Sequence, residues 1–134
     1  MTLVDSSVLI DVIEGQEPWV DWSESQLLAA REHGDLCINL IVYAEISRDF
    51  SDKTQLDVFL HDTGIAIAPM DDRIAYLAAQ AHDAYRSGGG QRAATLPDFF
   101  IGAHASVSAM PLLTRDPKRV RRYFPDVLLI SPDE

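Results

Sequence analysis

The sequence predicts an α/β protein in which a parallel five-stranded sheet carries helices on both faces. Short apolar runs alternate with longer segments of helical character along the whole chain. The apolar runs lack polar alternation, which is typical of parallel strands that are covered on both faces. The 134 residues contain no repeat, no low-complexity tract and no sign of a second domain, so we expect one domain spanning 1–134.

The expected strands are, in chain order, 3–4, 36–38, 65–68, 112–113 and 127–130. The expected helices are 8–14, 18–33, 40–49, 53–63, a long helix that begins at Asp71 or Asp72 and is broken by Gly88-Gly89-Gly90, 99–109, and a short basic helix opened by Pro117. The residues expected to begin or end helices are Ser6 or Ser7, Pro18 and Asn39 at starts, and Gly15, Gly34 and Gly64 at ends. The small residues of the helix at 99–109, such as Gly102, are expected to allow close packing against the sheet.

One acid lies beside a buried helix face. Val42, Ile46 and Phe50 are spaced i, i+4, i+8 and form an apolar stripe, which Glu45 borders. A carboxylate at such a position tends to face inward, where it needs a partner. That partner is either a cation such as Arg48 or something that binds several carboxylates.

Two further acids follow predicted strands, because Asp5 comes after 3–4 and Asp116 comes just after 112–113. In open α/β sheets, sites form beyond the carboxyl ends of the strands, where the strand order reverses. If the first and fourth strands are neighbours, as in the order 3-2-1-4-5, both acids lie over one crevice. Asp98 begins the helix before the fourth strand and Glu45 follows the second, so all four acids can line it.

Crowded carboxylates raise the pKa of one another, whereas a hard divalent cation with oxygen ligands reverses that effect. Mg²⁺ is therefore the expected occupant, with Mn²⁺ as a second possibility. Each acid alone also has a structural interpretation: Asp98 as a first-turn charge, Glu45 as a partner of Arg48, and Asp116 as part of a turn. The histidines are dispersed and Cys37 is the single cysteine, so no zinc pattern is present.

The charge distribution is uneven on an acidic chain of net charge −10. Five of its eleven basic residues lie within 115–122: Arg115, Lys118, Arg119, Arg121 and Arg122. They form either a solvated helix or a local patch that contacts phosphates. A lone cysteine, no basic leader segment and no apolar run long enough for a membrane span together favour a cytoplasmic protein without membrane attachment.

Four segments resemble one family when they are taken together. They are 3–11 (LVDSSVLID), 43–46 (YAEI), 96–105 (LPDFFIGAHA) and 112–116 (LLTRD). Each is weak alone, but in this order and spacing they resemble the motifs of PIN-domain ribonucleases, especially the VapC-type toxins of type II toxin–antitoxin pairs. The resemblance covers nearly the whole chain.

The resemblance implies the strand order 3-2-1-4-5 and Mg²⁺-dependent endonucleolytic cleavage of RNA phosphodiesters by metal-activated water, leaving 5′-phosphate and 3′-hydroxyl ends. It implies a catalytic and metal-binding set made of Asp5, Glu45, Asp98 and Asp116. Thr114 matches a hydroxyl of the fourth motif, and Ser7 stands where some members have asparagine. The basic residues of 115–122 would hold the RNA backbone. A cognate antitoxin and a homodimer are the implied protein partners.

Two other classes remain open from the sequence. One is another metal-dependent phosphohydrolase or a receiver domain on a similar sheet, although the second acid or late lysine that these need is not found. The other is a non-catalytic PIN-like module that binds RNA or protein. Trp19 with Trp22 and Tyr123 with Phe124 are expected to pack internally, and Gly88-Gly89-Gly90 to be a connector or to shape the RNA path.

Overall fold

The computed structural model describes residues 1–89 and 94–132, which contain five strands and seven helices. The strands are β1 (Thr2–Val4), β2 (Leu36–Ile38), β3 (Ile65–Ile67), β4 (Leu112–Leu113) and β5 (Leu129–Ile130). The helices are α1 (Ser6–Glu14), α2 (Val20–His33), α3 (Leu40–Ser47), α4 (Lys53–Thr63), α5 (Asp72–Ser87), α6 (Leu96–Ser108) and α7 (Lys118–Tyr123). The predicted α/β class is confirmed.

All five strands form one parallel sheet in the order β3-β2-β1-β4-β5, as predicted. The chain builds outward from β1 to β3 on one side and returns through β4 and β5 on the other. The order therefore reverses between β1 and β4, where Val4 lies beside Leu113. The amide of Asp5 donates to the carbonyl of Leu113 at 2.9 Å, which holds the ends of these two strands together.

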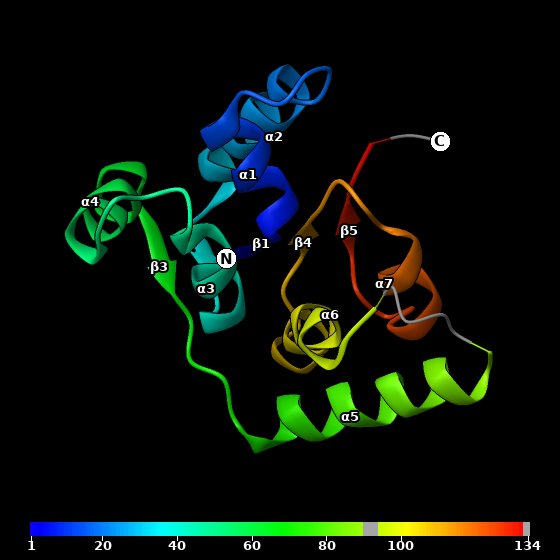
Figure 1. Ribbon diagram of the computed structural model, residues 1–134. Coiled ribbons are helices and arrows are strands. Elements are labelled where there is room, and N and C mark those ends of the chain that lie inside the picture. The colour runs from blue at the N-terminus through cyan, green and yellow to red at the C-terminus, as the bar shows by residue number, and fades with distance from the viewer. Residues whose placement is uncertain (90–93, 133–134) are drawn as a thin grey trace.

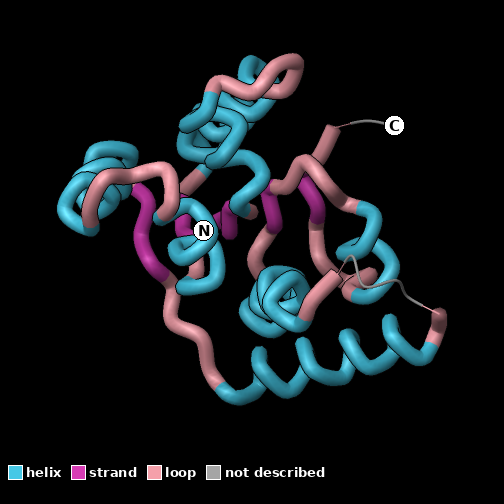
Figure 2. The backbone as a smooth tube through the Cα atoms, in the orientation of Figure 1, coloured by secondary structure: helices cyan, strands magenta, loops and turns pink. Residues whose placement is uncertain are grey.

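Helices surround the sheet, whose short strands lie in the middle of the molecule (Figures 1 and 2). A large apolar cluster follows the sheet and includes Leu3, Val4, Leu112 and Leu113, all fully buried. A second cluster joins α5, α6 and the end of α7 around Phe99 and Phe124. In Figure 1, α5 is the outermost helix along the lower side and packs along α6.

Three helix starts differ from the predictions. The first helix begins at Ser6, with Asp5 at its N-cap position, so neither Ser6 nor Ser7 is the cap. The second begins at Val20, after Pro18. The sixth begins at Leu96, because Thr95 and Asp98 form a reciprocal capping box there.

Other boundary predictions are confirmed. Asn39 caps α3 by accepting from the amide of Val42 at 3.0 Å. Gly15 and Gly64 end α1 and α4 in the left-handed region, with φ of 65° and 71°. Of the three consecutive glycines, Gly88 and Gly89 follow α5, and Gly90 lies outside the described residues. Among the helices that the structure describes, none has the length and hydrophobicity of a membrane span.

Candidate active site

The four predicted acids line one cavity of about 220 Å³ at the carboxyl edge of the sheet. Asp5 comes from the end of β1, Glu45 from α3, Asp98 from the first turn of α6 and Asp116 from the loop after β4. The reversal of strand order brings these distant segments together, as the sequence argument required.

Asp5 lies at the centre of a small hydroxyl network. Its Oδ2 atom accepts hydrogen bonds from Thr114 Oγ1 at 2.7 Å and from Ser7 Oγ at 3.0 Å. Burial raises the pKa of the Asp5 carboxyl, the nearby charge of Asp116 raises it further, and the two hydroxyl bonds oppose the rise. The threonine oxygen also accepts from the amide of Asp116 at 3.0 Å, so it ties the first and fourth acids together.

Glu45 has a buried carboxylate oxygen without a partner. Its Oε1 atom forms no hydrogen bond to any residue that the structure describes. Burial raises the pKa of Glu45, and the charges of Asp5 and Asp98 add to this rise. A hydrogen bond from Ser6 and the charge of Arg48 oppose this rise, but among the described residues Arg48 forms no ion pair with the carboxylate.

Asp98 and Asp116 have different surroundings. Oδ2 of Asp98 accepts from the amide and the hydroxyl of Thr95, at 2.6 Å and 3.1 Å, so this acid caps its helix as well as lining the cavity. The side chain of Asp116 is 70% exposed and lies 3.9 Å from the guanidinium of Arg115. The structural interpretation of Asp98 is therefore correct, and it does not exclude a second role.

Arg115 is held beside the acids by a buried clamp. Its Nε donates to Oδ2 of Asp11 at 2.7 Å, and Ser23 donates to the same oxygen at 2.8 Å. Its guanidinium carbon lies 5.4 Å from the ring centroid of Trp19. Its amide donates to Ser7 at 3.2 Å, which links the arginine to the network around Asp5.

The sequence prediction missed the roles of Asp11 and Trp19. Asp11 is completely buried on α1, three residues after Val8, at a position where the helix faces the core. An acid on an apolar helix face was the signal that could have identified it. Trp19 does contact Trp22, at 6.4 Å between ring centroids, but it also supports Arg115.

The basic residues of 115–122 differ in which cavity they line, and Arg119 lines two. Arg115 and Arg119 line the cavity of the four acids. Lys118, Arg119 and Arg122 line a neighbouring cavity, described below. Arg121 is exposed and lines neither of these two cavities.

The donors around the acid cavity fit a hard divalent cation, because they are oxygens and include an orphaned buried one on Glu45. Within 1–89 and 94–132, no group of three or more acidic, histidine or cysteine side chains is gathered tightly enough to hold an ion directly. Mg²⁺ commonly keeps several waters and uses only one or two carboxylates, and about 220 Å³ has room for such waters. His104 is buried against Asn39, at 3.2 Å, and belongs to the core.

Comparison with known families decides the assignment. The family model described as PIN domain matches residues 2–124. The chain belongs to the PIN domain family. The resemblance of its four motifs to this family is therefore confirmed. Comparison with curated protein sequences finds no match.

Solved structures share this PIN fold over nearly their full length. A chain of VapBC2 from Rickettsia felis, bound to a promoter DNA fragment, has 19% identity and a TM-score of 0.73, with 98% of each chain covered. A toxin–antitoxin complex from Klebsiella pneumoniae has 22% identity and a TM-score of 0.69, covering 100% of this chain and 99% of that one. VapBC-1 from nontypeable Haemophilus influenzae has 15% identity and a TM-score of 0.71, covering 97% and 96%.

Proposed function

We propose that this PIN domain is a Mg²⁺-dependent endoribonuclease and the toxin of a type II toxin–antitoxin pair. The observation that carries the proposal is the convergence of Asp5, Glu45, Asp98 and Asp116 on one cavity. Burial raises the pKa of Asp5 and Glu45, and neighbouring acids add to the rise, so the cluster costs free energy when no cation is bound. The same arrangement suits a divalent cation.

The cation would be held by Asp5 and Asp98, helped by Glu45 and Asp116. When bound, Mg²⁺ or Mn²⁺ acidifies water for attack on a phosphodiester and offsets the charge that builds on the phosphoryl oxygens. The orphaned Oε1 of Glu45 is the oxygen most in need of such a ligand.

The side chains around the acids orient them and the substrate. Thr114 and Ser7 hold Oδ2 of Asp5 at 2.7 Å and 3.0 Å, so the carboxylate keeps one orientation. Serine at position 7 serves by its hydroxyl, where some relatives have an amide. Arg115 and Arg119 line the same cavity and supply positive charge for the phosphates on either side of the cleaved bond. The expected products carry 5′-phosphate and 3′-hydroxyl ends.

The proposed partner is a cognate antitoxin, and a homodimer is the proposed assembly in the cytoplasm. The similar structure from Klebsiella pneumoniae is described as a toxin–antitoxin complex, and the one from Rickettsia felis as VapBC2 bound to a fragment of promoter DNA. This chain also exposes apolar side chains that a partner would cover, among them Leu28 on α2 at 61% and Val58 on α4 at 51%.

The decisive experiment measures cleavage of cellular RNA by the purified protein with Mg²⁺ and maps the ends of the products. Asp5→Ala should abolish cleavage while the circular dichroism spectrum is unchanged. Asp62→Ala, which removes an exposed acid of α4 outside the cavity, should cleave like the wild type. Full activity of Asp5→Ala would refute the assignment.

A second experiment tests the toxin role. Expression of this chain alone should arrest growth, and co-expression with the adjacent small gene should restore it. Normal growth and unchanged RNA in both cultures would remove the toxin proposal.

A further inference from the structure

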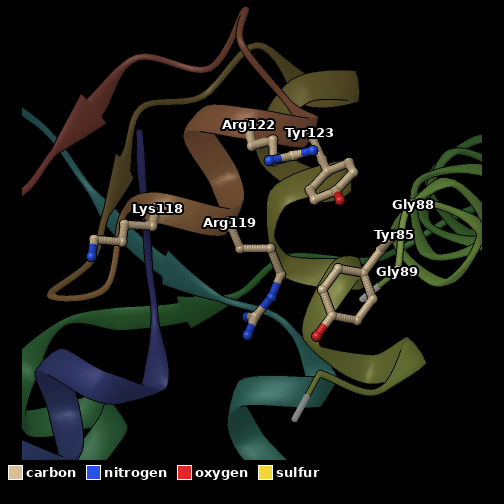
Figure 3. Close-up of a pocket in the computed structure, with 7 residues that line it drawn as sticks. All are labelled: Tyr85, Gly88, Gly89, Lys118, Arg119, Arg122 and Tyr123. Carbon is tan, nitrogen blue, oxygen red and sulfur yellow. The ribbon is translucent and has the colours of Figure 1, made fainter. Parts of the chain in front are cut away.

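A second cavity, of about 480 Å³, adjoins the cavity of the acids at α7. Tyr85 of α5 with Gly88 and Gly89 after it form one wall, and α7 forms the other (Figure 3). Its volume lies within the range of about 300–1,000 Å³ that is common for small-molecule sites. Arg119 lines both this cavity and that of the acids, so the two are contiguous across one side chain.

This cavity is positively charged on an acidic protein. Lys118, Arg119 and Arg122 line it, and none of its described lining residues is acidic. No described carboxylate forms an ion pair with any of these three cations, although the chain carries a net charge of −10. Three cations in one cavity, none of them in an ion pair with a described carboxylate, attract a ligand with more than one negative charge.

The same cavity has an aromatic wall. The rings of Tyr85 and Tyr123 meet edge to face, with centroids 6.0 Å apart, so the pair leaves no slot between two parallel rings. In Figure 3 the Arg119 side chain extends from α7 toward Tyr85, and Arg122 lies against Tyr123, its guanidinium carbon 5.6 Å from the ring centroid. Lys118 extends in the other direction, away from the rings.

Gly89 lines the cavity beside the aromatic wall. It adopts a φ of +83°, which favours glycine, and a Cβ built there would meet no described atom within 4 Å.

From these contacts we propose that the cavity binds one nucleotide of single-stranded RNA next to the cleaved bond. The base packs against Tyr123 and Tyr85, and Arg119, Arg122 and Lys118 hold its flanking phosphates. Aromatic rings with cations around them are the usual means of binding single strands, whose bases are free to stack. The proposal rests on the ribonuclease function above. It adds the path that the RNA strand takes from the cavity of the acids into the second cavity.

The test measures binding of two fluorescein-labelled probes by anisotropy in EDTA, so that cleavage does not interfere. One probe is a short oligoadenylate, and the other is a ribose-phosphate chain of equal length without bases. The wild type should bind the oligoadenylate about ten-fold more tightly, as expected for one stacked base. Tyr123→Leu should reduce this ratio to near one, whereas Tyr123→Phe, which keeps the ring, should preserve it.

Charge variants separate this pocket from general attraction to RNA. Arg122→Ala should weaken binding of both probes, and Arg121→Ala, which removes the same charge from the same helix outside the cavity, should weaken neither as much. Equal losses in the two variants would overturn the proposal. The arginine pair also keeps the proposal testable if Tyr123→Leu does not fold, which thermal melting would show.

The outcomes distinguish this pocket from the nuclease assignment. A wild-type ratio near one would refute base binding even if Mg²⁺-dependent cleavage is observed. A ten-fold ratio with its Tyr123 dependence would support the pocket even if no cleavage occurs. Binding of a polyglutamate peptide with the same Arg122 dependence, and no preference for bases, would mean that the pocket takes acidic protein and that the proposal is wrong.

Discussion

Replacing Asp5 with asparagine should separate the loss of stability that the acid cluster causes without metal from the stability that it gains when Mg²⁺ binds. Asparagine keeps an oxygen that can accept from Thr114 and Ser7, which now donate to Oδ2 at 2.7 Å and 3.0 Å. It removes a charge that burial and Asp116 disfavour, as the raised pKa of Asp5 indicates. Without metal, Asp5→Asn should therefore be at least as stable as the wild type at neutral pH.

The direction of the pH dependence follows from the same shift. A carboxyl whose folded pKa lies above its unfolded pKa, 3.8 for Asp5, stabilises the fold most at low pH. That contribution is lost as the pH rises through the folded pKa. The metal-free wild type should thus lose stability over this interval, and Asp5→Asn should lose less.

Adding Mg²⁺ should reverse the order of the two proteins. A ligand that binds only the folded state at 100 times its dissociation constant stabilises it by about 2.7 kcal/mol. A chain of 134 residues lies between the domains of about 60–100 and about 150–250 residues for which the shift in Tm per kcal/mol is known. The expected rise in Tm is therefore roughly 8–13 °C. The wild type should show this rise, and Asp5→Asn should show little of it.

The assay is thermal unfolding followed by circular dichroism, in EDTA and over a Mg²⁺ titration, with Asp62→Asn as the control. The control changes an exposed acid outside the cavity and should respond to Mg²⁺ like the wild type. If Asp5→Asn gains as much stability from Mg²⁺ as the wild type does, Asp5 is not a ligand. If the wild type gains none at any concentration, the metal site itself is refuted and a non-catalytic module is favoured.

Three further predictions concern residues near the site. Arg115→Ala should lower the free energy of unfolding, measured in urea, by about 2–4 kcal/mol, because it leaves the buried charge of Asp11 without its partner. Adding Asp11→Asn should recover part of this loss, and no recovery would exclude the ion pair as the cause. Gly102→Ala should cost about 1–3 kcal/mol in the same assay, since a Cβ there overlaps the buried ring of Phe124; an unchanged midpoint would show that the ring can move. Burial lowers the pKa of His104, so stability should fall as the pH drops below 6.5, the value for an exposed histidine, and His104→Gln should lack this component in urea titrations at several pH values.

The sequence predicted the fold class because its strands are short apolar runs bounded by clear helix signals. Gly64 and Asn39 act at helix boundaries as expected, since a left-handed turn and a side-chain cap depend only on local geometry. The strand order could be predicted only from the family resemblance. No local sequence feature indicates that β1 lies beside β4.

Local sequence rules did not predict the contacts of Ser7 and Gly102 in the folded protein. The first helix was expected to be capped by Ser6 or Ser7, yet the hydroxyl of Ser7 donates to Asp5 and supports the cavity. Gly102 was expected to lie close to the sheet, and it lies instead against Phe124, at the end of α7. The contacts of both residues depend on how the chain packs, so sequence spacing does not reveal them.

The interaction of Asp11 with Arg115 shows a more general limit. The two residues are 104 positions apart in the sequence and form a 2.7 Å ion pair in the folded chain. The spacing of apolar residues along a helix can identify a buried acid, but it does not identify the partner. The aromatic cavity is similar, because Tyr85 and Tyr123 come from α5 and α7, and Tyr123 was expected only to pack internally.

Buried carboxylate oxygens without partners help to separate structure from function in this protein. Among the described residues, three side chains carry one: Asp11, Glu45 and Asp49. Asp11 is compensated through its other oxygen by Arg115. Burial raises the pKa of Asp49, the neighbouring Glu14 adds to the rise, and this residue does not line the cavity of the four acids. Glu45 is different, since it lines the cavity, where burial raises its pKa and the charges of Asp5 and Asp98 add to the rise. A fold under selection for stability alone would replace such a group, because it costs free energy at neutral pH. Its presence at the cavity is therefore best explained by a cation that binds there.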